Sequence, residues 1–113
     1  MATYNRLDDR YLEDPVLRSL LYRDVCDKAN SQDEDLASHD IMPDEEYRPD
    51  LAAQRIWEVA ELRWVVRAIA GVDAEWDPLP VGKTIMAPPL AWIRDRIRHY
   101  ADNGEVTGTV TMD

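Results

Sequence analysis

Phenylalanine is missing from this sequence, and cysteine, histidine and glycine are scarce. Tryptophan and tyrosine must therefore supply the aromatic part of any core. Because Cys26 is alone, a disulfide within the chain is excluded, which fits a reducing compartment. No apolar run approaches the ~20 residues that a membrane span requires, and the N-terminal residues lack the apolar stretch of a signal peptide. A chain of 113 residues then fits one domain with extensions.

Familiar catalytic motifs are missing as well. The sequence has no glycine-rich phosphate loop and no GxSxG, HExxH or CxxC motif. Two interpretations of His39 are open, a metal ligand together with Asp35 or Asp40 and a solvated loop residue. The second is favoured, because no other histidine or cysteine has suitable spacing. We therefore expect a protein that is not an enzyme and that has no cofactor and no metal.

Negative charge dominates the composition, with a formal net charge of -10. This average disfavours nucleic acid and an anionic membrane as partners. The charge is unevenly spread, because residues 33–50 contain many acids and one arginine, Arg48, whereas Arg94–Arg98 is basic. The division fits two interpretations, docking between oppositely charged neighbours in an assembly and an ordinary solvated acidic linker.

The first clear helix is predicted to begin at Asp14-Pro15 and to end at Asn30-Ser31. Asp14 suits the N-cap, and proline suits the first helical position because its missing N–H would have no partner there. Apolar residues then recur with helical spacing, namely Val16, Leu17, Leu20, Leu21, Val25 and Ala29. We favour packing of this stripe on the chain's own core over docking to a partner. Residues 1–13 are expected to be a polar arm, and residues 31–44 a linker.

Two strands are predicted on either side of a helical hairpin. The first is placed at Glu45–Arg48, with Tyr47 pointing inward. The second is placed at Lys83–Ala87, where Pro88-Pro89 would stop it. Antiparallel pairing of these strands would put both helices on one face of the sheet.

The two helices of this hairpin are predicted from apolar periodicity and from local end signals. Pro49 begins the first helix, and Gly71 is placed at the C-terminal end of the second. Trp57 and Trp64 are expected in the core, and Gly82 in a turn before the second strand.

A last helix is predicted at Leu90–Ala101, with Asn103-Gly104 as its stop. After it, residues 104–113 alternate valine and methionine with threonine and glycine. Two interpretations of this segment are open, a free tail and a strand added to the sheet edge of a neighbour, and we favour the tail.

Five residues are candidates for contact with partners: Trp76, Trp92, Arg94, Arg98 and Tyr100. Trp76 lies in a predicted loop and is expected to be the most exposed of the four tryptophans. It fits either a plug packed over the helix ends or a platform that stacks on a sugar, and we favour the plug.

The segment from Glu46 to Pro89 resembles the LysM fold, and in particular the LysM-like module of small baseplate proteins, the wedge subunits of contractile phage tails. The resemblance covers about forty percent of the chain. It is carried by Tyr47, by Arg48-Pro49-Asp50-Leu51-Ala52, by Leu62-Arg63-Trp64-Val65-Val66 with Ile69, by Trp76-Asp77-Pro78, by Leu79-Pro80-Val81-Gly82-Lys83-Thr84-Ile85 and by Ala87-Pro88.

Two positions depart from the glycan-binding members of the LysM family. Those members usually carry a Gly-Asp-Thr-type start to the first helix, where this chain has Arg48-Pro49-Asp50. They also usually carry an asparagine after the second helix, where this chain has Gly71. The resemblance therefore implies a scaffold rather than a sugar-binding module.

The sequence thus predicts an α+β fold in three parts. A small LysM-like β-α-α-β module at residues 45–89 follows an N-terminal arm, helix and acidic linker at residues 1–44, and precedes a C-terminal helix and tail at residues 90–113. The resemblance implies a structural wedge subunit of a phage tail baseplate, which assembles in the host cytoplasm and contacts other baseplate and tail proteins in the virion. The alternatives are a peptidoglycan-binding LysM module and an acidic regulatory or DNA-mimic protein.

Overall fold

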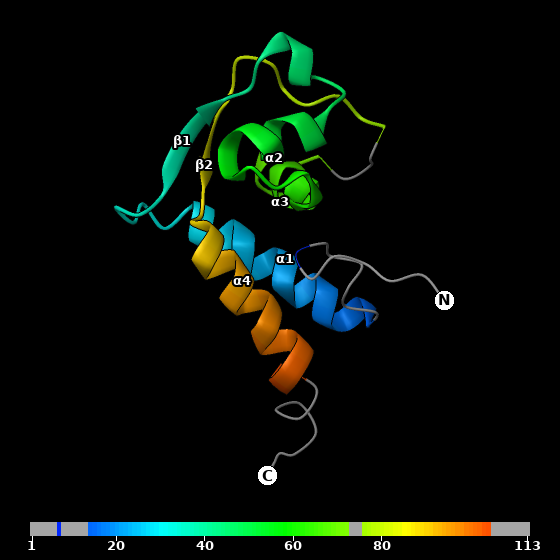
Figure 1. The fold of residues 1–113 in the computed structure, drawn as a ribbon, viewed down its shortest axis with the longest axis vertical. Helices are drawn as coiled ribbons and strands as arrows, with labels where there is room; N and C mark the ends of the chain where they lie inside the picture. Colours follow the sequence, from blue (N-terminus) through cyan, green and yellow to red (C-terminus); the bar gives the residue numbers. More distant parts are fainter. Residues whose placement is uncertain (1–6, 8–13, 73–75, 105–113) are drawn as a thin grey trace.

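The computed structural model describes residue 7, residues 14–72 and residues 76–104, and in this part of the chain it is a small α+β domain (Figure 1). The α-helices are α1 (Pro15–Ala29), α2 (Pro49–Trp57), α3 (Arg63–Ala70) and α4 (Leu90–Arg98), and the strands are β1 (Ala37–Asp40) and β2 (Thr84–Ala87). The shorter segments are the 3-10 turns η2 (Pro43–Glu45) and η3 (Ala60–Leu62) and the π-helical segment η4 (His99–Gly104). The predicted α+β class is confirmed.

The sheet consists of β1 and β2, which pair antiparallel with Ala37 opposite Ala87 and Asp40 opposite Thr84. In β2, Ile85 and Ala87 are buried, whereas Thr84 and Met86 are exposed. Helices α2 and α3 lie together on one side of the sheet (Figure 1). The antiparallel pairing and the placement of both helices on one face therefore agree with the prediction.

The predicted position of the first strand is wrong. It was placed at Glu45–Arg48, whereas β1 lies inside the segment that composition alone marks as a linker. Glu45 instead ends the 3-10 turn η2, and Tyr47 is 64% exposed rather than inward. The cause is tertiary, because the partner strand selects residues 37–40 although they include no strong strand formers.

The ends of α1 and the C-terminal end of α3 follow the local signals. The side chain of Asp14 accepts a hydrogen bond from the N–H of Val16 at 2.8 Å, and α1 ends with Asn30 as its C-cap. Gly71 ends α3 at φ +79°, and Gly82 forms the turn before β2 at φ +89°. These positive φ values are ones that side-chain-bearing residues rarely adopt, so the two predicted glycine positions are confirmed.

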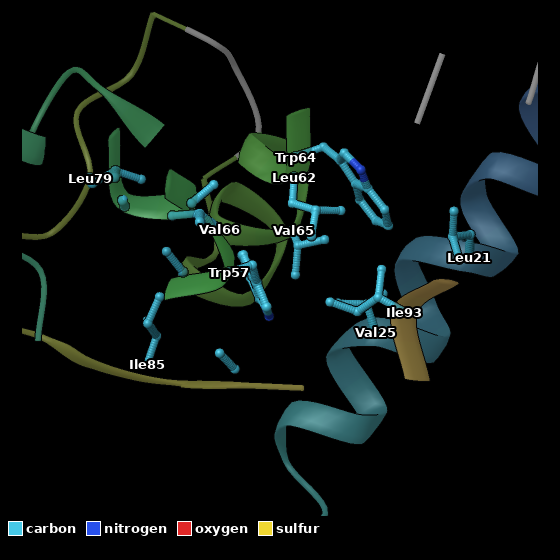
Figure 2. Close-up of a cluster of buried hydrophobic side chains, with 14 of the residues drawn as sticks. Leu21, Val25, Trp57, Leu62, Trp64, Val65, Val66, Leu79, Ile85 and Ile93 are labelled. Carbon is cyan, nitrogen blue, oxygen red and sulfur yellow. The ribbon is translucent and has the colours of Figure 1, made fainter. Parts of the chain in front are cut away.

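The core is centred on the two predicted tryptophans, and Figure 2 shows them among the aliphatic side chains of α3. The indole N–H of Trp57 donates to the carbonyl oxygen of Pro88, and that of Trp64 donates to the carbonyl oxygen of Leu7, each at 2.8 Å. Each buried indole therefore satisfies its polar atom while its ring packs in the core.

The helices on either side of the hairpin share this core. Leu21 and Val25 of α1 are fully buried and face Ile93 of α4 and the α3 side chains (Figure 2). Packing of the α1 stripe on the chain's own core is therefore confirmed for these residues, whereas Val16 at the start of the helix is 66% exposed. Burial of one leucine or valine side chain contributes about 1.5–3 kcal/mol, so α1 and α4 stabilise the module.

The α-helical part of the last helix is shorter than predicted. It ends at Arg98 and continues as η4 to Gly104, where the predicted stop lies. The predicted arm at residues 1–13, apart from Leu7, lies outside the described residues, as do residues 105–113 of the predicted tail.

Candidate docking surface

The end of the molecule at η2 is organised around one buried carboxylate, that of Glu45. Its side chain is fully buried. One oxygen, Oε1, is 2.9 Å from both the N–H of Met42 and Nε2 of His39, and Oε2 accepts from Nη1 of Arg55 at 2.8 Å. Burial alone would raise the pKa of Glu45, but the hydrogen bonds from Met42, His39 and Arg55 outweigh it and lower the pKa.

The carboxylate therefore keeps its charge and acts only as an acceptor, so Nε2 of His39 carries the donated proton. His39 belongs to β1, Glu45 to η2 and Arg55 to α2. Arg55 also binds Asp44 through Nη2 at 2.6 Å, which lowers the pKa of that carboxyl group. One charged cluster thus ties the sheet, the turn and the helix together, and His39 is a structural residue rather than a solvated loop residue.

Large apolar side chains are exposed in the two segments that follow β1 and precede β2. Trp76 is 80% exposed, Tyr47 is 64% exposed, and Met42 and Val81 are also exposed. We call these four residues the apolar rim. An exposed aromatic side chain gives a large gain in free energy when a partner covers it, so the rim has the composition of a protein contact.

The apolar rim comes from two segments that hydrogen bonds hold side by side. The N–H of Leu79 donates to the carbonyl oxygen of Glu46 at 2.6 Å. The N–H of Gly82 donates to the carbonyl oxygen of Ile41 at 2.8 Å. Both segments cross the same end of the molecule, at the top of Figure 1. Tyr47, Met42 and Val81 each adjoin one of these bonded residues in the sequence. Trp76 lies three residues before Leu79.

The four remaining predicted contact residues lie on α4 and η4, away from Trp76. Arg94 and Arg98 are exposed, and Trp92 is half-buried with Nζ of Lys28 5.8 Å from its ring centroid. The structure therefore groups these helical residues in one region and separates them from the apolar rim.

Tyr100 differs from the other predicted contact residues because it is buried. Its hydroxyl donates to Oδ2 of Asp24 at 2.5 Å, and Nη1 of Arg96 lies 3.3 Å from the same oxygen. Burial and the bond to Asp24 raise the pKa of Tyr100 to about 12. Within the described chain this residue joins α4 and η4 to α1.

A pocket of about 200 Å³ lies between α1 and α3, lined by Tyr22, Cys26, Trp64, Arg67, Ala68 and Val72. The thiol of Cys26 lies 3.4 Å from the carbonyl oxygen of Ala68. Burial, followed by the neighbouring charge of Asp27, raises the pKa of Cys26. The thiol is therefore protonated at neutral pH and lacks the reactivity of a catalytic thiolate.

Among residues 7, 14–72 and 76–104, no three His, Cys, Asp or Glu side chains are grouped so that they could hold a metal ion. Over the same residues, no helix is long and apolar enough to cross a membrane.

Of the four rim residues, the exposure of Trp76 was predicted from the sequence and that of the other three was not. Tyr47 was assigned to a strand interior, and the hydrogen-bond acceptor role of Glu45 was not recognised. A signal existed, because Glu45 stands three residues after Met42 and binds its N–H as the glutamate of a capping box does. The signal was incomplete, since Met42 has no side-chain oxygen to complete the motif.

Comparison of the chain with protein-family models, with curated proteins and with solved structures gave no match in any of the three.

Proposed function

We infer that the protein is a structural, non-enzymatic subunit of a phage tail baseplate, a wedge component that assembles with other baseplate and tail proteins. The observation that carries this proposal is the apolar rim. Its aromatic side chains are exposed on a domain whose own core is already filled by Trp57 and Trp64. A partner that covers Tyr47 and Trp76 gains their burial without disturbing that core.

The order of the elements supports the likeness to the LysM-like module of wedge proteins. Along the chain, β1, α2, α3 and β2 follow the β-α-α-β order of that module. The module then begins at Ala37 rather than at Glu45, and α4 follows Pro88-Pro89 as it does in many members of that family.

Charge indicates what kind of surface the rim would meet. Glu46 and Asp77 stand next to rim residues, and neither forms an ion pair within the described chain. The α4 region exposes Arg94 and Arg98 instead. Complementary charges steer association and set its orientation, so the rim would meet an apolar surface bordered by lysine or arginine.

The test is a paired substitution, Tyr47→Ser with Trp76→Ser, in the phage genome that encodes the chain. We expect normal folding by circular dichroism, together with incomplete baseplates and few assembled tails in electron micrographs. The matched control is Val16→Ser, because Val16 is equally exposed but lies on α1. Genes for tail sheath, tube and baseplate proteins beside this gene would support the same class, and normal tails from the paired variant would contradict it.

Two rival functions give different results. In the first, the protein is retained on purified cell wall and the Trp76→Ala variant is not. That result would indicate a peptidoglycan-binding module in place of a scaffold. A stable monomer that binds a basic enzyme, in a cell without tail genes near this one, would indicate a regulatory or DNA-mimic protein.

A further inference from the structure

The outer edge of β1 is open in the described part of the chain. The sheet order is β1–β2, and β2 lies between β1 and the helices α2 and α3 (Figure 1). The N–H of Ile41 donates to the carbonyl oxygen of Lys83 at 3.0 Å, so the backbone groups of Ile41 face the β2 side. Because backbone groups alternate in direction along a strand, those of Ser38 and Asp40 point away from β2.

Local hydrogen bonds mark both ends of this edge. The N–H of Leu36 donates to the carbonyl oxygen of Asp33, and the N–H of Met42 donates to the side chain of Glu45. Between these closed ends, Ser38 and Asp40 each present one N–H and one carbonyl group outward. An antiparallel strand placed there would pair with both residues, which is how extended segments add to exposed sheet edges.

The two faces of the sheet specify the pattern of a strand that would fit. Ile85 and Ala87 are buried on the core face, whereas Ser38, Asp40 and Thr84 are exposed on the other. An added strand should therefore alternate apolar and polar side chains.

The chain contains a segment with this alternation at residues 105–113, EVTGTVTMD. Val106, Val110 and Met112 share one face of such a strand, and threonines occupy the other. Valine and threonine are also strong strand formers.

We propose that residues 105–113 of one copy of this chain add as a strand to the outer edge of β1 in a second copy. The valines then extend the apolar face of the sheet, and the threonines lie beside the exposed face that holds Thr84.

The donor is a second copy because residues 105–113 of the same chain could place only a small part of their length along β1. Residues 90–104 lead away from the end of β2 (Figure 1), over roughly 20 Å at about 1.5 Å per residue. Residues 105–113 span at most about 30 Å when extended. Turning back would use about 20 Å of that length and would leave about 10 Å, or about three of these residues, to pair. The inference is independent of the proposed function, because it uses neither Tyr47 nor Trp76.

The first experiment measures the mass of the purified full chain by light scattering over a range of concentrations. We expect a species of at least twice the mass of one chain. Ser38→Pro removes an outward N–H without removing a bond between β1 and β2, so this variant should be a monomer with an unchanged circular dichroism spectrum. Ser38→Thr keeps the N–H and should assemble as the original chain does.

The second experiment keeps the proposal testable if Ser38→Pro does not fold. The chain ended after Gly104 should be a monomer, and a synthetic peptide of residues 105–113 should bind it. Binding should slow hydrogen exchange at the amides of Ser38 and Asp40 and leave that of His39, which faces β2, nearly unchanged. A monomeric full chain overturns the proposal, as does an oligomer that survives removal of residues 105–113. Peptide binding without protection of Ser38 and Asp40 overturns it as well.

Discussion

Two carboxylates hold the two ends of this domain, and their surroundings differ. Glu45 is fully buried and accepts from a backbone N–H, a histidine and an arginine. Asp24 is partly exposed and binds Tyr100 and Arg96 between α1 and α4. At the η2 end, Glu45 binds a backbone N–H and an arginine, so the charged cluster holds the backbone directly. Between α1 and α4, the hydrogen bonds of Asp24 add to a contact that buried apolar side chains already make. We therefore expect the loss of the Glu45 carboxylate to cost more stability than the loss of the contact at Asp24.

Replacing Glu45 by alanine should have the largest effect. Met42 would lose the acceptor of its N–H, and His39 and Arg55 would lose a shared partner. Leaving a hydrogen-bond donor without its acceptor costs about 1–3 kcal/mol, and more where the acceptor was charged. That is a large share of the roughly 5–15 kcal/mol that stabilise a typical domain. Urea unfolding followed by tryptophan fluorescence measures the loss, with Glu46→Ala as the control because its side chain makes no ion pair in the described chain.

The pH dependence gives a second measure of Glu45. Because its pKa is lowered in the folded state, its contribution is complete above the unfolded value near 4.5 and is lost as the pH falls through the folded value. The original chain should therefore lose stability on acidification, and Glu45→Gln should flatten that dependence. An unchanged acid profile in Glu45→Gln would show that the cluster does not hold this end of the fold.

The contact between α1 and α4 should show an intermediate effect at alkaline pH. The pKa of Tyr100 is raised to about 12 from 10.0, so its contribution is complete below pH 10 and is lost as the pH rises through about 12. Two pH units correspond to about 2–3 kcal/mol.

Thermal unfolding between pH 8 and 12 measures this loss, and Tyr100→Phe should remove the alkaline phase while costing about 1–2 kcal/mol at pH 7. Asp24→Asn combined with Tyr100→Phe completes a double-mutant cycle. If Tyr100→Phe costs as much as Glu45→Ala, the contrast between the two ends is wrong.

A surface ion pair should show the smallest effect. Nζ of Lys28 lies 2.7 Å from Asp33 and 3.0 Å from Asp35, and both acids are exposed. Exposed ion pairs contribute little because water and salt screen them. Asp33→Asn should leave the urea midpoint unchanged within error in 0.15 M salt. A clear decrease would mean that the α1–β1 connection matters as much as the contact at Asp24.

The predicted position of the first strand is wrong, and the cause is physical. Residues 37–40, ASHD, contain no β-branched or aromatic residue, whereas Glu45–Arg48 contains Tyr47. Strand formation depends on the neighbour that supplies the hydrogen bonds, which for β1 is a segment more than forty positions away. The buried Glu45 was missed for a related reason, since its partners come from β1 and α2.

The contact residues show the same division. Trp76 was expected to be the most exposed tryptophan because it lies in a loop, and it is 80% exposed. The favoured interpretation of Trp76 as a plug packed over the helix ends is therefore wrong. Tyr100 was predicted on the apolar side of the last helix, and in the folded chain it is buried and its hydroxyl donates to Asp24 of α1. The LysM-like likeness and the baseplate role stay predictions that the rim substitutions test.

The start of α1, the end of α3 and the glycine turn before β2 follow from the amino-acid sequence alone. Asp14 and Pro15, Gly71 and Gly82 act through their own backbone stereochemistry and nearest neighbours. The choice of β1, the burial of Glu45 and the exposure of Tyr47 instead required the folded chain. Each depends on pairing or desolvation between segments that meet only in three dimensions, and no local pattern contains that information.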